Sequence, residues 1–591
     1  MIAVTTRQDQ GAAEPPAQRG THTTVFPAPT GTTTRGRRTP CVCAVTMAGA
    51  RPPGLRRARA LPRCWGAVAR AGAAANATSC PAHPNHATLC PIVRGATGEG
   101  KQMTQHHEGT SVARTTSRPL TTLPGPRGLP LLGNLLQLKA TQLHTILEHW
   151  ADTYGPLYTF RLARKPVVAI AEPDLIHEVL RHRPETYRRL GAIASVFEDL
   201  GGHGVFAAEG ARWRRQRRVV MQALSTLQLR QFFPTLTTVT ARLKTRWERA
   251  ARAGDVVDIP TDLMRYTVDV TTPLAFGYGM NTLEHEGGEL QQHLAQMLPT
   301  INRRCNALFP YWHFLTLPAD RAFERAMAAL RTVMATCIAQ GRARAAQDPT
   351  GGTHPTNVLE AMLAARDEEG RALSDAEIMS NVLTMLVAGE DTTAHTMAWM
   401  LHFMTDVPAV QHTMQQEADA VLGEARMLPD FRAQERLRYI EAVAYETLRL
   451  KSVAPLLFFE PTQPVDLGGI HLPAGTAVFL LTRYGGLQEH AFTAAGQFQP
   501  DRWLTAPMEP RCGHAPQALM PFGGGPRVCP GRTLAFLEMK AVMAMLCRNF
   551  TVTKPVEAPP VGEHFAFTMQ PIHLTLQVRS RERGRPPREI L

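Results

Sequence analysis

Long hydrophobic runs are missing from this chain of 591 residues. No stretch of about eighteen or more apolar residues occurs, and the first residues lack the charged and then apolar layout of a signal peptide. Hydrophobic residues make up 44% and charged residues 19%, a balance that is typical of globular proteins. We therefore expect a folded, cytoplasmic protein without a membrane span.

Several metal and nucleotide patterns are also missing. Five of the ten cysteines lie in the first ninety residues, without the C-x-x-C spacing of a zinc site. Dispersed cysteines favour a reducing compartment over a disulfide framework. Neither a G-x-G-x-x-G run after an expected strand nor a four-cysteine iron–sulfur pattern occurs, so we expect no fused electron-transfer domain.

Positive charge is concentrated at the beginning of the chain. The net charge is +14, and residues 1–102 supply +10 of it, with thirteen Arg or Lys against three Asp or Glu. The remaining +4 removes most of the case for a nucleic-acid surface. Residues 1–118 show no sustained period and are expected to be a disordered basic leader. Either this leader is part of the protein, or translation starts at Met103. The codons just before Met103 could form a ribosome-binding site, which favours the second alternative.

Helix-forming residues dominate the rest of the sequence. Order is expected from Leu123, where a Pro- and Gly-rich segment begins, and a hairpin is expected over 157–162 and 166–171. Residues 210–450 are rich in Ala, Leu, Arg, Met and Glu, and short strands return near 454–481 and 564–579. Residues 119–591 are thus predicted to form one large domain, mainly α with minor β structure, with a long central helix and small sheets.

A glycine-rich loop that ends in a cysteine is the most informative segment. Phe522-Gly-Gly-Gly-Pro-Arg-Val-Cys-Pro-Gly531 precedes an expected amphipathic helix, and its glycines allow the loop to lie flat against a planar ligand. Pro530 suits the first helical position, so Cys529 is expected at the N-cap, where the helix dipole favours a thiolate. The alternative is a buried cysteine beside a turn, but the pattern F-x-x-G-x-R-x-C-x-G fixes five residue types.

A second motif lies in the middle of a long expected helix. Ser374-Asp-Ala-Glu377 is a capping box, and no proline follows until Pro408, which allows about thirty helical residues. The motif A-G-E-D-T-T (388–393) brings two threonines whose hydroxyls can bond to preceding carbonyls. The alternative is a solvated acidic patch, but apolar flanks indicate a buried helix, in which an unpaired Asp391 would be costly.

Two further patterns carry little weight alone. Glu446 and Arg449 are three residues apart on an expected helix, a spacing usually found in surface ion pairs of small energy. Trp213 and Arg217 lie in a basic helix, for which a solvated arginine face or a nucleic-acid patch are alternatives. Their order along the chain gives them weight, because F-Q-P-D-R-W with Arg502 follows E-x-x-R and precedes the cysteine loop.

Taken in this order, the motifs between 123 and 580 resemble those of the cytochrome P450 family. The resemblance implies that Cys529 is the axial ligand of haem b, whose thiolate promotes O–O cleavage. It also implies that Arg527, Trp213 and Arg217 reach the haem propionates and that Phe522 packs near the sulfur.

The resemblance assigns roles to the other motifs as well. Thr392 would hydrogen-bond dioxygen and Asp391 would relay protons. Glu446, Arg449 and Arg502 would form a buried charge network that holds the cysteine loop. One departure from the family is that residues 482–496 lack the usual Arg-Asp-Pro-like run, which leaves the local fold there open.

The resemblance implies a soluble, bacterial-type monooxygenase that inserts one oxygen atom of O₂ into a lipophilic substrate by hydroxylation or epoxidation. Electrons would come from a separate ferredoxin or flavodoxin with its reductase, and surplus arginines beside Trp213 would attract an acidic carrier. A peroxide-driven peroxygenase or isomerase, and a non-catalytic haem sensor or carrier, are the alternatives. The expected substrate-lining residues are Ala388, 453–458, the 191–206 loop and 565–568.

Overall fold

The computed structural model describes residues 117–199, 201–285, 297–305, 307, 310–347, 355, 357–367, 370–504 and 515–581. The expected leader over 1–118 lies outside these ranges, apart from its last two residues. Order begins a few residues earlier than expected, because β1 (Arg118–Pro119) pairs in parallel with β8 (Ile470–Leu472). Leu120 and Leu123 pack on the apolar cluster around Ile470, so distant contacts fix this opening segment.

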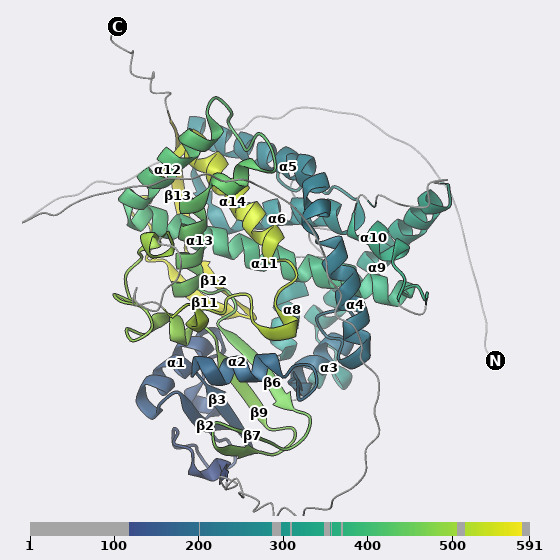
Figure 1. The fold of residues 1–591 in the computed structure, drawn as a ribbon, viewed down its shortest axis with the longest axis vertical. Helices are drawn as coiled ribbons and strands as arrows, with labels where there is room; N and C mark the ends of the chain where they lie inside the picture. Colours follow the sequence, from purple (N-terminus) through teal and green to yellow (C-terminus); the bar gives the residue numbers. More distant parts are fainter. Residues whose placement is uncertain are drawn as a thin grey trace, which may run out of the picture. The chain divides into compact units, whose positions relative to one another are not determined.

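Helices form most of the described chain, as the sequence predicted (Figure 1). The helices before the central one are α1 (Leu143–Tyr154), α2 (Pro173–Arg181), α3 (Gly191–Asp199), α4 (Gly210–Ala223), α5 (Thr226–Ala253), α6 (Ile259–Phe276), α8 (Met297–Cys305), α9 (Pro318–Gln347) and α10 (Val358–Ala364). The others are α11 (Asp375–Asp406), α12 (Pro408–Leu422), α13 (Arg438–Leu450) and α14 (Arg532–Asn549). Within the described ranges, no helix combines the length and the apolar character needed to cross a lipid bilayer.

Four small sheets accompany the helices. The largest has five strands in the order β2-β3-β9-β6-β4 and contains the expected hairpin, β2 paired antiparallel with β3. The others are β1-β8-β7, β10-β13-β5 and β11-β12. The remaining strands are β2 (Leu157–Leu162), β3 (Lys165–Ile170), β4 (Tyr187–Arg189), β5 (Val256–Asp258), β6 (Leu456–Pro461), β7 (Val465–Leu467), β9 (Ala477–Leu481), β10 (Phe550–Thr553), β11 (Gly562–Ala566), β12 (Thr568–Ile572) and β13 (Thr575–Ser580).

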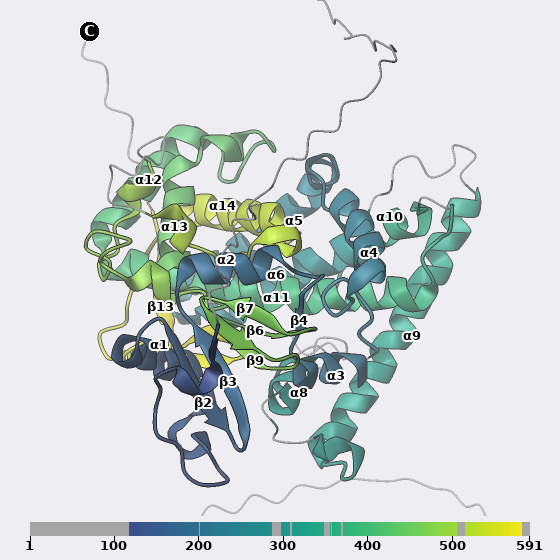
Figure 2. The same ribbon diagram turned by 60° about the horizontal axis from the view of Figure 1, so that its bottom comes forward.

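The five-stranded sheet lies below most of the helices in Figure 1 and comes forward in Figure 2, and both faces of its strand β9 are buried. Side chains of β9 alternate, as the two-residue period of a strand requires. Val478 and Leu480 pack in the cluster that contains α2, whereas Phe479 and Leu481 pack in the cluster that contains α1.

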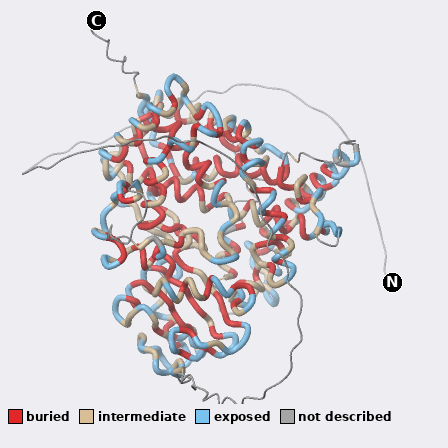
Figure 3. Tube along the Cα trace, viewed as in Figure 1, coloured by how far each residue is buried: buried red, intermediate tan, exposed pale blue. Residues whose placement is uncertain are grey.

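Helix α11 crosses the interior and is mostly buried (Figures 1 and 3). It starts at the predicted capping box, in which the Ser374 hydroxyl accepts from Glu377 N, and it ends just before Pro408. A Cβ atom at Gly389 would lie 3.3 Å from Thr271 Oγ1, so glycine allows α6 to approach closely. Thr267 on α6 donates to the Glu390 carbonyl oxygen at 2.8 Å.

Residues 482–496, whose fold the sequence left open, are ordered around a buried arginine. Arg483 donates to Glu148 at 2.8 and 2.5 Å and to Glu563 at 3.1 Å. Burial alone would lower the pKa of Arg483, but the two carboxylates hold it above its usual value. A short 3-10 helix, Tyr484–Leu487, follows and presents Gly486 to the neighbouring α13.

Candidate active site

The cysteine loop is held against α2 by a glycine. A Cβ atom at Gly525, whose φ is +63°, would lie 2.2 Å from the Leu180 carbonyl oxygen, so only glycine permits this contact. The Cys529 amide donates to the Phe522 carbonyl oxygen at 2.9 Å, closing the loop. The Phe522 ring lies 5.6 Å from the Phe536 ring of α14.

Cys529 is not the N-cap of α14, contrary to the prediction. The helix begins at Arg532 with Gly531 as its N-cap, because the chain makes a further turn after Pro530 before it becomes helical. The expected electrostatic effect is still present, since the amides of Gly531 and Arg532 face the sulfur. Burial raises the pKa of the Cys529 thiol, and these amides and Arg217 oppose the rise.

Cys529 is exposed even though surrounding protein desolvates its thiol. Both observations hold if the sulfur faces an internal space. Helix α11 has matching features, because Ala388 is exposed in the middle of this otherwise buried helix and Thr392, one turn later, is half-buried. Helix α11 thus has an accessible stretch at Ala388 and Thr392, as the cysteine loop has at Cys529.

Four arginines, buried or half-buried, lie beside this loop, and two of them share one carboxylate. Arg527 pairs with Glu209, and Arg183 pairs with the same carboxylate at 3.1 Å. Burial and the positive charge of Arg183 lower the pKa of Arg189 to about 9 and that of Arg527 to about 10. Arg217 donates to the Val528 carbonyl oxygen at 2.5 Å. The cluster therefore carries an excess of positive charge.

This cluster fits the propionates of a haem. The Nε atoms of Arg183, Arg189 and Arg527 are buried without a hydrogen-bond partner, and such atoms normally have one. The Arg527 guanidinium also lies 4.6 Å from the centre of the buried Trp213 ring, which keeps it in place. A thiol that the loop presents beside an arginine cluster suits a group that carries both an iron and two carboxylates, as haem b does.

The acid and alcohol of α11 point to different partners. Asp391 is buried and accepts a hydrogen bond from the Thr568 hydroxyl of β12. Thr392 Oγ1 donates to the Ala388 carbonyl oxygen at 2.7 Å, the contact that the sequence predicted for such threonines. Glu390 lies beside α6, and burial and the neighbouring Asp391 raise its pKa to about 8.

Glu446, Arg449 and Arg502 lie in contact inside the protein. Arg449 donates to the two Glu446 oxygens at 2.9 and 2.7 Å, and Arg502 Nε donates to Glu446 at 3.1 Å. Trp503 Nε1 and the Gln499 amide donate to the same carboxylate at 2.8 and 2.9 Å. The other Arg449 donors reach the carbonyl oxygens of Gly486, Ala495 and Gln497. The network therefore fixes the chain that leads to the cysteine loop.

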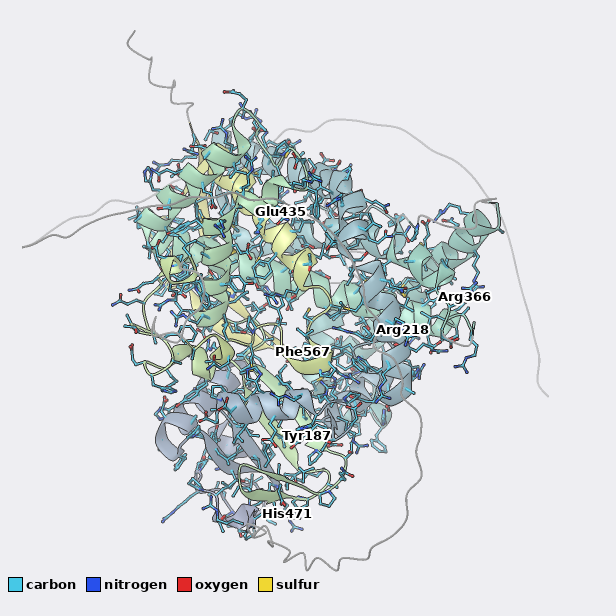
Figure 4. All side chains as sticks on the ribbon, viewed as in Figure 1. Tyr187, Arg218, Arg366, Glu435, His471 and Phe567 are labelled. Carbon is cyan, nitrogen blue, oxygen red and sulfur yellow. The ribbon has the colours of Figure 1, made fainter. Side chains whose placement is uncertain are left out.

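Three of the expected substrate-lining segments converge. Phe567, which follows β11, lies 6.0 Å from the Phe197 ring of α3 and 6.5 Å from the Phe206 ring. Figure 4 labels Phe567 and shows it between the helices above and the sheet below. The Met569 amide donates to the Val453 carbonyl oxygen at 2.8 Å, which joins the segment before β6 to the same group.

The surplus arginines of α4 are engaged with carboxylates of this chain. Arg214 pairs with Glu185, and Arg215 pairs with Glu377. Arg212 lies 3.6 Å from Glu377. These contacts partly neutralise the positive charge that was expected to attract an acidic electron carrier.

Sequence reasoning missed Glu209, Arg183, Arg189 and His395, and it placed Thr568 only among the substrate-lining residues. Glu209 is the N-cap of α4, and an acid just before a basic helix was the one available signal. Thr568 hydrogen-bonds to Asp391 from a distant part of the chain, and no local sequence pattern predicts this contact. His395 Nδ1 lies 3.3 Å from Asp391 Oδ1, at the four-residue spacing that a closer study of the motif's flank would have found.

The cytochrome P450 family model matches residues 123–578, and this match covers the whole site. The chain belongs to the cytochrome P450 family and is a haem-thiolate monooxygenase, an oxidoreductase.

Relatives and a solved structure agree with this assignment. Mouse cytochrome P450 2W1 is 29% identical over 77% of this chain and 92% of its own length. Cyclooctatin synthase of Streptomyces melanosporofaciens is 29% identical, over 73% of this chain and 91% of its own length. The crystal structure of the cytochrome P450DA heme domain superposes with a TM-score of 0.70, at 25% identity over 79% of this chain and 98% of that chain.

A bifunctional cytochrome P450/NADPH–P450 reductase of Gibberella moniliformis is also similar, at 26% identity over 79% of this chain. The chain spans 41% of the length of that relative. These relatives come from a fungus, a mammal and a bacterium, and one of them is fused to a reductase. They therefore do not confirm the prediction of a bacterial-type enzyme without a fused reductase.

Proposed function

We propose that this monooxygenase hydroxylates or epoxidises a lipophilic substrate with one atom of O₂, while the other atom leaves as water. The balance per turnover is one O₂, two electrons and two protons. The observation that carries the proposal is the pair of the buried Asp391 and the half-buried Thr392 on α11, on a helix that also bears the exposed Ala388. An acid and an alcohol at this place suit proton delivery to dioxygen.

Each residue of the site has a defined task in this proposal. Cys529 would bind the iron of haem b, which supplies dioxygen activation when bound, and Arg217 and Arg527 would orient the propionates. The Thr392 hydroxyl gives its proton toward dioxygen, and Asp391 restores it. Phe522 would pack near the sulfur, and Trp213, whose ring lies 4.6 Å from the Arg527 guanidinium, would reach the propionates.

The charge network of Glu446, Arg449 and Arg502 has a structural task. It holds residues 486–499 against α13, which positions the cysteine loop. This role is supported by the five donors that surround the Glu446 carboxylate.

The aromatic group around Phe567 supports a lipophilic substrate. Phe197, Phe206 and Phe567 present apolar rings to one another, and aromatic surfaces bind apolar molecules well. We further propose that a separate ferredoxin or flavodoxin with its reductase supplies electrons, and that the protein acts in the cytoplasm, which the dispersed cysteines favour.

The test of thiolate ligation is the difference spectrum of the reduced, carbon-monoxide-treated protein. The wild type should show the red-shifted Soret band of a haem thiolate, and Cys529→Ser should lose it. Cys547→Ser, at a buried cysteine of α14, is the control that should keep the band. An unchanged spectrum in Cys529→Ser would refute the assignment.

The test of the acid and alcohol is the coupling of NAD(P)H consumption to product. Thr392→Ala should still consume NAD(P)H but release peroxide, and it should form at least about tenfold less product than the wild type. Turnover of the wild type with peroxide but with no reductase system would favour the peroxygenase alternative instead.

A further inference from the structure

A stripe of polar side chains follows one face of the second half of α11. Its members are Asp391, His395, Trp399, His402 and Asp406, at steps of four, four, three and four residues, which keeps them on one side of a helix. They interrupt a helix whose other residues in this half are mostly apolar and buried. We call these five residues the α11 stripe.

Neighbouring members of the α11 stripe lie close together. Asp391 Oδ1 is 3.3 Å from His395 Nδ1, and His402 Nε2 is 3.2 Å from Asp406 Oδ2. The rings of Trp399 and His402 are 5.3 Å apart. Side-chain exposure is 7% at Asp391 and 1% at His395, and it then rises to 13% at His402 and 40% at Asp406. The stripe thus runs from the buried acid of the site to solvent.

Three buried nitrogen atoms of the stripe have no hydrogen-bond partner in the protein. They are His395 Nδ1, Trp399 Nε1 and His402 Nδ1. Buried polar atoms almost always bond to protein or to ordered water. A water molecule placed among these polar atoms would satisfy them, and water would have to join the members that are too far apart for direct bonds.

One hydroxyl and two lysines face the stripe from other elements, and Thr568 of β12 donates to Asp391. Lys451 Nζ lies 5.0 Å from the centre of the Trp399 ring and pairs with Glu563 of β11. Lys554 pairs with Asp406. Burial and these two lysines lower the pKa of His402 to about 4 against the opposing effect of Asp406. A neutral imidazole can accept a proton on one nitrogen and release one from the other.

We propose that the α11 stripe is the route by which protons pass from solvent at Asp406 to Asp391. This inference rests on the proposed roles of Asp391 and Thr392. Monooxygenation consumes two protons and two electrons per O₂, the electrons coming from NAD(P)H through the redox partner. Each proton enters at the Asp406 carboxylate, moves through His402, water and His395, and leaves at Asp391 toward Thr392. After transfer, every member has regained its starting protonation state.

The variants His395→Gln and His402→Gln test this route. Glutamine keeps a polar side chain but has no titrating nitrogen. His412→Gln is the control, because His412 is an exposed histidine on α12 that contacts Gln416. The full-length holoenzyme would be supplied with NADPH, a plant-type ferredoxin and its reductase, with lauric acid as a lipophilic probe, and NADPH oxidation under air would be followed in H₂O and in D₂O.

Both stripe variants should oxidise NADPH about tenfold more slowly than the control, since proton supply limits them. Their ratio of rates in H₂O and D₂O should exceed that of the wild type, while carbon-monoxide spectra and melting temperatures stay unchanged. Wild-type rates in both variants, or slower rates with an unchanged isotope ratio, would overturn the proposal, because a purely structural role leaves that ratio alone.

The double variant His395→Gln with Thr392→Ala separates this proposal from the proposed function. If the stripe supplies protons to Asp391 and Thr392, the double variant should oxidise NADPH no more slowly than Thr392→Ala alone. A further loss of rate in the double variant would refute the route. Wild-type coupling in Thr392→Ala would instead refute the role of the pair itself.

Discussion

At the scale of single residues, Glu446 shows how strongly one buried charge depends on its partners. Its carboxylate is fully buried and accepts from two arginines, one indole and one amide. A buried ion pair contributes little compared with apolar residues, but removing one partner leaves charge without compensation. Glu446 is therefore a residue whose substitution should disturb the fold more than the chemistry.

We expect Glu446→Gln to lower the free energy of unfolding by about 3–5 kcal/mol, because Arg449 and Arg502 would lose their counter-charge. Urea denaturation of the holoenzyme measures this. Asp375→Asn, which breaks the exposed pair with Arg342, should change it by less than about 1 kcal/mol. Equal losses in the two variants would contradict the structural role of the network.

Glu390 gives the stability a dependence on pH. The folded protein raises its pKa to about 8 through burial and Asp391, so between about pH 4.5 and pH 8 the folded state binds more protons than the unfolded state. Stability should therefore fall as pH rises through this window, by up to about 1.4 kcal/mol per pH unit. In Glu390→Gln, unfolding measured at several pH values should lose this part of the slope, and an identical slope would disprove the assignment.

At the scale of elements, α11 joins the opposing parts of the site. Its capping box fixes the first turn, and Gly389 allows α6 to approach closely. Asp391 accepts a hydrogen bond from the hydroxyl of Thr568 on β12. A shift of this helix would move the Thr392 hydroxyl away from the loop that carries Cys529. Its end caps should therefore affect both stability and the coupling of electrons to product.

Ser374→Ala should cost about 1 kcal/mol, because it removes the side chain that accepts from Glu377 N. Hydrogen exchange at the first turn of α11 should become faster. Ser195→Ala on α3 removes a hydroxyl that only donates to the Ala192 carbonyl oxygen, and it should leave that exchange as it is. Unchanged protection in Ser374→Ala would contradict the capping role.

The elements also show what sequence alone reveals. The long helix with its capping box and the hairpin of β2 and β3 were predicted, because local periods and breakers define them. The three-residue strands β4 and β5 were not, since their pairing with β6 and β13 is decided by chain far away. At the site, local motifs were enough to propose Cys529 and the acid–alcohol pair, but the arginine cluster forms only when α2 and α4 pack beside the cysteine loop.

At the scale of the whole molecule, the arginine cluster couples folding to the cofactor. Arg183, Arg189 and Arg527 repel one another around the single carboxylate of Glu209. A bound group that carries two carboxylates relieves this repulsion, and a ligand that binds only the folded state stabilises it. Cofactor binding and stability should therefore rise and fall together.

Removal of haem should lower the melting temperature. The corresponding loss in the free energy of unfolding is about 4 kcal/mol, relative to protein with haem at a thousandfold excess over its Kd. In Arg527→Gln the difference between the holo- and apoproteins should be smaller, because one propionate partner is gone. Calorimetry of the two forms, with Arg436→Gln on the surface as the control, measures this. The same difference in Arg527→Gln as in the control would argue against the cluster as the propionate site.

The pairing of β5 with β13 has a consequence for how the protein is made. Helices α5, α6 and α11 leave the ribosome well before the strand that completes this sheet and before Thr568, the partner of Asp391. During this interval apolar helix faces and a carboxylate without its final partner are present in the nascent chain, the condition in which chains aggregate. Assembly of the centre is therefore a late event of synthesis.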